Sequence, residues 1–412
     1  MERRVVVTGL GMVSPLGLDV SSTWQALIRG ESGAGPITAF DTSAFDVKIA
    51  CEVKGFDPQH YFEVKDARRM DRFTQFAVVA AQEAIKQSAL EVNSANENDI
   101  GVVIGNNKGG IITLCNQIDI LKEKGPRRVS PFLVPMMMVN RAAAEIAIKL
   151  GLKGCNFCTS SACASGATAI GEAFHIIKRG DAQVMLAGGV EASIVPVVIA
   201  GFGNMKALST RNTEPGKASR PFDAERDGFV VGEGGAVLVL EERDFALQRG
   251  ARILAELAGY GSSADAFHIS EPAEGGEGLA RAITQALGWA KLPPEAVDYI
   301  NAHGTGTPLG DKKETAAIKR AFGKHAYKLA VSSTKSETGH LISGAGALAS
   351  VFCVMTIKEN IIPPTINQEH PDPECDLDYV PNMARKANVN VALANSLGFG
   401  GHNTALIFTK HE

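Results

Sequence analysis

The sequence predicts an α/β protein made of two duplicated halves. Apolar runs of strand length alternate with helical patterns along the chain, which favours layers of sheet and helix. Each half closes on a predicted hairpin with a glycine-rich turn, at residues 232–235 in the first half and 398–401 in the second. The 412 residues exceed one ordinary core, and 45% of them are hydrophobic. We expect the halves at residues 1–250 and 251–412.

In the first half, strands are expected at residues 5–7, 100–105, 155–159 and 183–188, and a hairpin at 228–242. A helix is expected from Ser22, and a second helix carries apolar residues at helical spacing: Phe73, Phe76, Ala77, Ala80, Ala81 and Ala84. The apolar run 155–159 indicates a buried strand. Three consecutive methionines in the loop 130–139 suit core filling, a greasy channel or a subunit interface.

The second half repeats the alternation of strands and helices. Helices are expected at residues 278–290, 312–322 and 347–358, and strands at 297–302 and 329–333. The closing hairpin pairs residues 391–396 with 404–409. Only the two hairpins correspond directly between the halves, so the duplication is a prediction from pattern.

Several classes of protein are excluded by composition and motif. The net charge of −4 gives no reason to expect nucleic acid as a partner. The first glycine turn lacks the third glycine of a dinucleotide-binding site, and Ser14-Pro15 occupies the expected helix start. Residues 184–202 are apolar but contain Glu191 and Pro196, so no membrane span is expected.

Cysteine usage and the N-terminus predict a cytoplasmic protein. Seven cysteines without framework spacing argue against a disulfide-stabilised secreted chain. Cys155 and Cys158 have the C-x-x-C spacing of a zinc or redox site, but no second pair or histidine follows at ligand spacing. No signal peptide is expected, because Glu2-Arg3-Arg4 precedes only a short apolar run.

Cys163 is the candidate nucleophile. It stands among small residues between a predicted strand and a predicted helix that ends at Gly180. At a helix N-terminus, unpaired N–H groups and the helix dipole favour the reactive thiolate. A small buried cysteine that fills a gap in the core is the alternative.

Two histidine motifs in the second half supply possible partners for Cys163. His303 lies in N-A-H-G-T-G-T-P at residues 301–308, and His340 ends K-S-E-T-G-H at residues 335–340. Each motif follows a predicted strand, which could aim its histidine into a shared cleft together with Lys335. Asp311 and Glu314 could act as counter-ions of Lys335 or as solvated carboxylates at a helix start.

Motifs along nearly the whole chain resemble those of the β-ketoacyl-[acyl-carrier-protein] synthases of the second type. The matching segments are V-V-V-T-G-L-G at 5–11, G-P-R-R-V-S-P-F at 125–132, S-R-P-F-D at 219–223, D-G-F-V-V-G-E-G at 227–234 and N-S-L-G-F-G-G-H-N at 395–403. The resemblance implies a thiolase-like fold of five layers, α-β-α-β-α, from two duplicated halves. It also implies a homodimer that elongates acyl chains carried on the phosphopantetheine arm of acyl carrier protein, with no permanently bound cofactor. No metal is expected, because Ala349 stands where the family has a glutamate that is associated with a buried water or ion network.

The resemblance also implies roles for individual residues. Cys163 would carry the acyl chain, the backbone N–H groups of Cys163 and Phe399 would hold the oxyanion, and His303 and His340 would stabilise the malonyl-derived enolate. Lys335 would tune the charge of the site. The remaining implied positions are Thr305 and Thr307 for the pantetheine arm, Lys108, Phe202 and Ile342 for the acyl pocket, and Lys65, Arg68, Arg69 and Lys206 for docking of the acidic carrier protein.

Two positions depart from the family pattern. Lys108 stands where the family has a bulky apolar gate, so the side chain must be paired, point toward a dimer interface, or leave a shortened or polar pocket. An altered chain-length preference is therefore expected. Ala349 replaces a glutamate, which keeps a catalytic ketosynthase of a specialised polyketide pathway as an alternative function.

Two further alternatives are disfavoured by the residues present. A degradative thiolase would have a second cysteine near the C-terminal glycine turn, and residues 398–403 contain none. A non-catalytic chain-length partner subunit would generally lack the nucleophile, whereas this chain keeps Cys163, His303 and His340.

Overall fold

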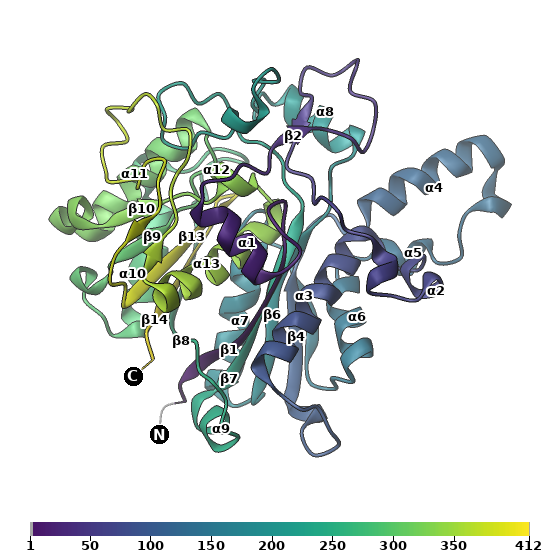
Figure 1. Ribbon diagram of the computed structural model, residues 1–412, viewed down its shortest axis with the longest axis horizontal. Coiled ribbons are helices and arrows are strands. Elements are labelled where there is room, and N and C mark those ends of the chain that lie inside the picture. Colours follow the sequence, from purple (N-terminus) through teal and green to yellow (C-terminus); the bar gives the residue numbers. More distant parts are fainter. Residues whose placement is uncertain (1–2, 412) are drawn as a thin grey trace.

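The computed structural model describes residues 3–411 and contains two five-stranded groups that share one continuous sheet (Figure 1). The first group has the order β1-β7-β6-β4-β5, with β1 (Val5–Val13), β4 (Ile100–Gly105), β5 (Asn156–Thr159), β6 (Val184–Glu191) and β7 (Gly234–Glu242). The second has the order β8-β14-β13-β9-β10, with β8 (Ala255–Ala264), β9 (Tyr299–Asn301), β10 (Ala330–Ser332), β13 (Val391–Gly398) and β14 (His402–Thr409). The groups join where β1 pairs with β8 over only three residues.

The two groups share one topology. In the order given, each runs through two antiparallel pairings and then two parallel pairings. Two halves with the same strand order and directions confirm the predicted duplication. The division at residue 250 falls between α9 (Arg243–Gln248) and β8, and that boundary stays a prediction.

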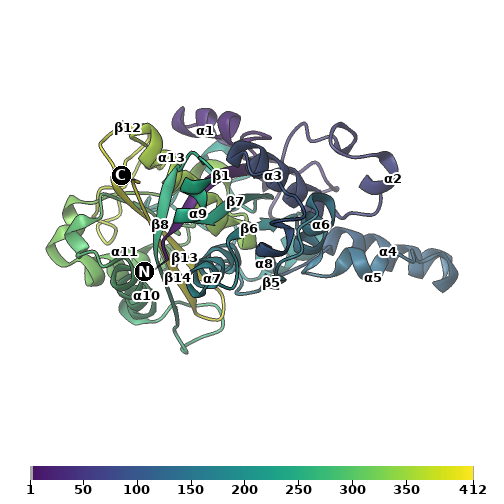
Figure 2. The same cartoon turned by 90° about the horizontal axis from the view of Figure 1, so that it is seen from below.

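Helices form three layers around the two strand groups (Figures 1 and 2). The outer helices of the first half are α3 (Arg72–Ser88) and α6 (Arg141–Leu150); α7 (Ser165–Arg179) and α13 (Ala345–Glu359) lie between the strand groups; α10 (Glu277–Ala290) and α11 (Pro308–Phe322) cover the second half. The five-layered α-β-α-β-α fold is thus confirmed. Strands β1, β6 and β7 are buried at every residue because helices cover both of their faces.

The middle layer explains a long apolar helix. The helical stretch Ile342–Glu359 has the length and composition of a membrane span, but 89% of that stretch is buried inside the protein. Its residues pack against both strand groups and against α7. The burial of this helix between the two strand groups therefore accounts for its apolar composition.

Shorter elements connect these layers. The helices are α1 (Val20–Ile28), α2 (Val64–Ala67), α4 (Ile111–Lys124), α5 (Leu133–Met137), α8 (Pro196–Asn204) and α12 (Lys335–Thr338). Two small ribbons pair β2 (Gly35–Pro36) with β3 (Ile49–Ala50) and β11 (Ile361–Ile362) with β12 (Arg385–Lys386). The six predicted apolar positions of α3 are all buried, and Asp71 caps its first turn.

The predicted hairpin at residues 228–242 is wrong. Only β7 is a strand, and it pairs with β1 and β6. Gly234 has φ +131°, and a Cβ there would lie 2.3 Å from the Val13 carbonyl oxygen. The glycines thus allow close packing of the chain before β7. The closing hairpin of the second half, β13 with β14, is confirmed.

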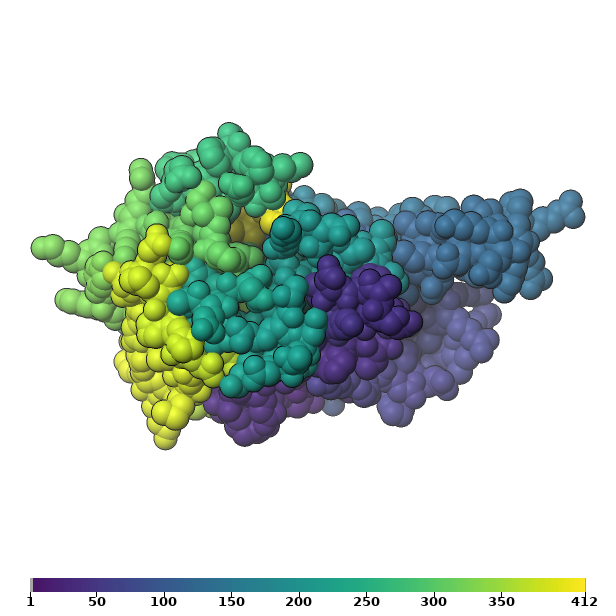
Figure 3. All heavy atoms as spheres, turned by 90° about the horizontal axis from the view of Figure 1, so that it is seen from above, coloured from purple at the N-terminus to yellow at the C-terminus, as the bar shows by residue number. Residues whose placement is uncertain are grey.

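The predicted buried strand at residues 155–159 is also wrong in its burial. β5 pairs only with β4 and lies at the end of the sheet, so Cys155 and Phe157 are exposed. Met137 and Met138 of the neighbouring α5 region are exposed as well, which excludes core filling for these two. Helix α4 projects from the body of the molecule and buries none of its residues (Figures 1 and 3).

Candidate active site

Cys163 lies in a tight turn between β5 and α7. Ala162, the residue before it, has φ +48°, a left-handed conformation that is strained for an alanine. The Ser165 hydroxyl donates to the Ala162 carbonyl at 2.6 Å and accepts from the Ser161 N–H at 3.0 Å. Gly398 packs so closely that a Cβ there would lie 3.2 Å from the Cys163 nitrogen. The turn at Ala162 and the β13–β14 hairpin therefore together fix the direction of the Cys163 side chain.

The Cys163 thiol is protonated at rest. Burial raises its pKa to about 11, although the charges of Lys108 and Lys335 and a hydrogen bond from the Phe399 backbone N–H act in the opposite direction. Burial therefore opposes the expected thiolate, and the helix itself starts only at Ser165. The Phe399 N–H does point at the sulfur, as an oxyanion donor should.

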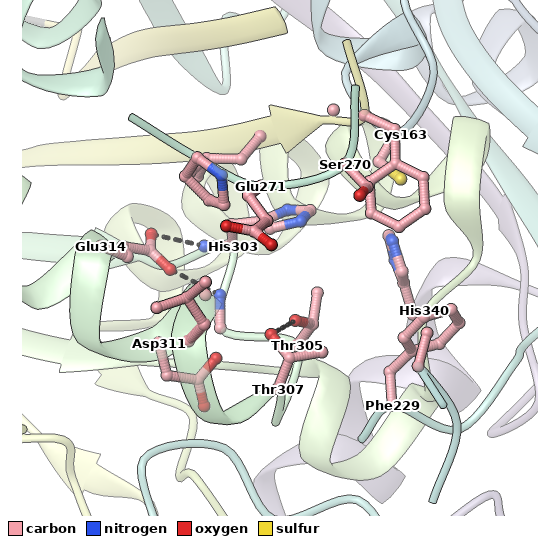
Figure 4. Close-up of a pocket in the computed structure, with 18 of the residues that line it drawn as sticks. Cys163, Phe229, Ser270, Glu271, His303, Thr305, Thr307, Asp311, Glu314 and His340 are labelled. Carbon is pink, nitrogen blue, oxygen red and sulfur yellow. Dashed lines mark hydrogen bonds between the residues drawn. The ribbon is translucent and has the colours of Figure 1, made fainter. Parts of the chain in front are cut away.

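His303 and His340 meet in front of Cys163 (Figure 4). Their ring centres are 5.2 Å apart and the rings are nearly perpendicular. His303 follows β9, whereas His340 follows the short helix α12 and not a strand directly. The backbone of His340 is held by Val230 at 2.7 Å and by Gly232 at 2.9 Å, both from the first half.

Both imidazoles are neutral at physiological pH. Burial lowers the pKa of each histidine well below its usual value, and the charge of Lys335 lowers both further. Within residues 3–411, neither buried Nδ1 atom has a hydrogen-bond partner. Neutral imidazole N–H groups can donate to a developing oxyanion without protonating it outright.

Lys335 and two carboxylates support the histidine loop. The Lys335 ammonium is buried and donates to the Ala302 carbonyl at 3.4 Å. Glu314 accepts from the backbone N–H groups of His303 at 2.8 Å and Gly304 at 2.6 Å. Asp311 in turn accepts from Phe222 and Gly306. Both carboxylates are about 1% exposed, so the alternative of solvated helix-end groups is wrong.

Charge couples Lys335 to this support. Burial lowers the pKa of Lys335 to about 8, and the charge of Glu314 opposes that shift. Burial also raises the pKa of Asp311 to about 6. The expectation that Glu314 acts as a counter-ion is consistent with this coupling, but its direct hydrogen bonds go to the loop backbone.

A cavity of about 340 Å³ brings most of the predicted residues together. Figure 3 looks down on the mouth of this cavity, which is a recess between green and teal atoms with yellow atoms of the C-terminal segment at its floor. Thr305 and Thr307 line it with their hydroxyl oxygens 3.1 Å apart. The predicted residues that line it are Cys163, Phe202, Lys206, His303, Thr305, Thr307, His340, Ile342 and Phe399. The loop at residues 265–272 also lines it, and no sequence motif pointed to that loop.

Lys108 is turned inward and paired. Its ammonium lies 3.3 Å from the Glu191 carboxylate, and the Glu191 side chain is completely buried. Of the alternatives open from sequence, the structure therefore favours a polar site over a side chain that points to an interface. Ala349 lies on α13 within an apolar cluster. Among residues 3–411, no group of three His, Cys, Asp or Glu side chains is placed to hold a metal ion.

The four predicted docking cations do not form a single patch on the surface of this chain. Lys206 is exposed at the mouth of the cavity. Lys65 and Arg68 are exposed on and after α2, and the Arg69 guanidinium lies 4.5 Å from the Phe132 ring centre. Figures 1 and 2 show α2 well apart from α8, the helix that precedes Lys206.

Comparison with known proteins gives the same family along the whole chain. Residues 2–246 match the model for the β-ketoacyl synthase N-terminal domain, and residues 254–369 match that for its C-terminal domain. The chain is 53% identical over 411 residues to 3-oxoacyl-[acyl-carrier-protein] synthase 2 of Synechocystis sp., covering 100% of this chain and 99% of the relative. It is 49% identical to the protein of that name from Coxiella burnetii over 409 residues, 99% of each chain.

Solved structures agree over the full length. A β-ketoacyl synthase from Burkholderia phymatum superimposes with a TM-score of 0.92 at 36% identity, and the ishigamide ketosynthase/chain length factor with 0.93 at 36%; both alignments cover 100% of each chain. A type II polyketide ketosynthase solved in complex with its acyl-carrier protein gives 0.91 at 34%, again covering 100% of each chain. The family indicated by the motifs is confirmed: the chain belongs to the β-ketoacyl synthase family of condensing enzymes.

Proposed function

We propose that the protein is a 3-oxoacyl-[acyl-carrier-protein] synthase that elongates fatty acyl chains by two carbons through decarboxylative Claisen condensation. The observation that carries the proposal is the joint placement of Cys163, the Phe399 N–H and two neutral histidines at one cavity. The relatives of that name, about half identical over the full chain, support the same reaction.

In the first half-reaction, the Cys163 sulfur attacks the thioester carbonyl of an acyl-carrier protein. The carbonyl oxygen becomes an oxyanion that the N–H groups of Phe399 and Cys163 stabilise. The carbon–sulfur bond to the carrier breaks, the acyl group remains on Cys163, and the thiol proton leaves with the pantetheine thiol. Because the resting thiol has a pKa of about 11, the attack must be coupled to removal of that proton.

In the second half-reaction, malonyl-carrier protein loses carbon dioxide at the same cavity. Cleavage of the carboxylate bond leaves an enolate, whose oxygen accepts hydrogen bonds from His303 and His340. The enolate carbon then attacks the thioester carbonyl on Cys163 and expels the enzyme sulfur as a thiolate, which takes up one proton from solvent to restore the resting thiol. The product is a 3-oxoacyl group on the second carrier, two carbons longer than the acyl group that entered.

Product analysis tests this proposal. The protein is mixed with acyl-carrier and malonyl-carrier proteins, and the carrier-bound products are resolved by mass. The expected product is the 3-oxoacyl chain extended by two carbons, with one carbon dioxide released per extension. Acyl transfer to water or to coenzyme A without extension would contradict it.

The catalytic ketosynthase of a specialised polyketide pathway remains the second candidate. The buried Lys108–Glu191 pair makes the site more polar than a purely alkyl substrate requires. One structural neighbour is a type II polyketide ketosynthase by title, at 34% identity, and another is a ketosynthase/chain length factor, at 36%. The fatty acyl reaction is preferred because the relatives named for it are 49–53% identical.

Acyl carrier protein is the proposed partner, and no permanently bound cofactor is needed. A structural neighbour was solved with its acyl-carrier protein, and here Thr305 and Thr307 offer hydroxyls to a pantetheine arm that enters the cavity. Lys206 at the mouth and the cations Lys65, Arg68 and Arg69 would attract an acidic carrier. All seven cysteines are free, which suits a reducing, cytoplasmic setting.

We also propose a homodimer that forms along β5. Among residues 3–411, no strand pairs with the outer edge of β5, and unpaired edges are normally covered or blunted. The segment from residue 118 to β5 also contains many exposed apolar side chains. They are Ile118, Leu121, Phe132, Val134, Met137, Met138, Ile148 and Phe157. A second copy related by twofold symmetry would cover this surface.

Replacing Phe157 with glutamate should convert the dimer to a monomer, because the substitution places a charge on the strand edge that the partner would bury. Light scattering after size exclusion measures the mass directly. Met383→Glu is the control, because Met383 is 78% exposed and lies in the other half of the chain. A Phe157→Glu protein that keeps the wild-type mass would contradict the proposed interface.

Lys335 should set the alkaline limit of malonyl decarboxylation. Its pKa of about 8 means that the buried ammonium, and its stabilisation of the enolate, are lost as pH rises through that value. The rate is therefore expected to be flat near neutrality and to fall above about pH 8. The Cys163→Ala background removes thiol titration from the measurement.

Lys335→Met is the informative variant for this limit. It should be slow at every pH and should lack the fall above pH 8. In the wild type, the free energy of unfolding should rise where the rate falls, between pH 8 and the usual lysine pKa of 10.5. In that range Lys335 is protonated in the unfolded chain but not in the folded chain, so raising the pH favours the folded chain. A wild-type profile that keeps rising past pH 9 would contradict the assignment.

A further inference from the structure

Lys108 brings a cation close to the wall of the cavity that contains Cys163. Its ammonium lies 5.8 Å from the centre of the Phe202 ring, and Phe202 lines the cavity that contains Cys163. The charge of Lys108 acts to lower the pKa of both Cys163 and His340. An acyl group on Cys163 would therefore pass through the field of this ammonium.

The ammonium is held in place by a built polar network. It donates to the Asn107 side-chain oxygen at 3.1 Å and to Glu191 Oε2 at 3.3 Å. The Ser343 hydroxyl donates to the same Glu191 oxygen at 2.6 Å. The turn that carries Lys108 is fixed by Asn106, which accepts from the Gly109 N–H at 2.6 Å.

This network leaves hydrogen-bonding capacity unused. An ammonium has three donors, and Asn107 and Glu191 engage two of them. Glu191 Oε1 is buried and has no partner within residues 3–411. A saturated chain beside Lys108 would leave the third N–H of the ammonium without an acceptor, whereas a carbonyl oxygen on the chain could accept from it.

We propose that Lys108, positioned by Glu191, is a specificity-determining residue that favours acyl groups with an oxygen near the thioester, such as 3-oxoacyl groups, over saturated groups of equal length. The inference rests on the condensing reaction of the proposed function, because it requires an acyl group on Cys163. A preference for 3-oxoacyl groups would favour the second candidate, the polyketide ketosynthase, over elongation of saturated chains. Lys108 selects by hydrogen bonding and takes no part in bond cleavage.

The test is the rate of acyl-enzyme formation, followed by intact-protein mass, for two carrier-bound probes of equal length. One probe is a saturated acyl group and the other is its 3-oxo form. The full-length wild-type protein should prefer the 3-oxo probe by about tenfold or more, since sites built to hydrogen-bond a substrate discriminate against analogues without the polar group.

The test variant must remove the charges of Lys108 and Glu191 at the same time. Lys108→Met alone leaves the Glu191 carboxylate buried without its cation and endangers folding. In the double variant K108M/E191Q, the glutamine can still accept from Ser343 while the site carries no charge. The preference for the 3-oxo probe should fall about tenfold, mainly through faster acylation by the saturated probe. Lys324→Met, an exposed lysine on the far half, should keep the wild-type ratio.

The outcomes separate this inference from the proposed function. A wild-type protein that is acylated equally by both probes, or faster by the saturated one, overturns the inference and leaves the condensing reaction intact. The same holds for a double variant with an unchanged ratio. If neither probe nor any other acyl-carrier protein acylates Cys163, the proposed function itself is overturned.

Discussion

Cys163→Ala should abolish the covalent acyl-enzyme and lower condensation by at least about 10³-fold, because no other group at the cavity can take over a covalent nucleophile's role. Six other cysteines are present, but none of them lines the cavity within the part of the chain that the structure describes. Burial also raises the pKa of several of these thiols, including Cys353, which makes them inert. Intact-protein mass before and after addition of acyl-carrier protein gives the measurement.

The same variant should still decarboxylate malonyl-carrier protein. Decarboxylation depends on enolate stabilisation by the histidines and not on the sulfur, so carbon dioxide release should persist without extension. Cys51→Ala is the matched control, because Cys51 is a fully buried thiol that lies outside the cavity. A Cys163→Ala protein that still accumulates acyl-enzyme would refute the role of Cys163.

His303→Ala and His340→Ala should each slow decarboxylation and condensation by about 10²–10³-fold, the cost of losing one donor to a developing oxyanion. Transfer of the acyl group to Cys163 should be affected much less, because its oxyanion donors are backbone N–H groups. The comparison of single-turnover acylation with carbon dioxide release separates the two half-reactions in each variant.

His325 offers the control for these substitutions. It lies in the second half, donates from its Nε2 to the Val297 carbonyl at 3.0 Å, and does not line the cavity. His325→Ala should retain near wild-type decarboxylation. If His303→Ala and His340→Ala block acylation and leave decarboxylation unchanged, the proposed division of labour between histidines and backbone is wrong.

Periodicity and motifs predict much of this fold because they report local preferences. Alternation of strand and helix lengths predicted β4, α10 and the β13–β14 hairpin, and the helical spacing of alanines predicted α3. The family motifs predicted nine of the residues that line the cavity, whereas the predicted Lys108 and Lys335 are not among its lining residues. The burial of β5 was predicted less well: Cys155 and Phe157 are exposed because this strand lies at the end of the sheet.

The support of the site could not be predicted from local sequence. Glu314 and Asp311 look like ordinary carboxylates in the first turns of a helix, yet both are buried as acceptors for loop backbone. Likewise, Glu191 lies 83 residues from Lys108, and nothing in either segment indicates the other. Such long-range partners depend on how the layers stack, which spacing in the chain does not encode.

The most direct measurement is a chase of isolated acyl-enzyme. Protein acylated on Cys163 with an isotope-labelled chain is freed of carrier and then mixed with malonyl-carrier protein. The account predicts loss of the adduct mass at the rate at which labelled 3-oxoacyl-carrier appears, two carbons longer, with one carbon dioxide per adduct. An adduct that persists while unlabelled product forms, or that is released as free acid without extension, would contradict it.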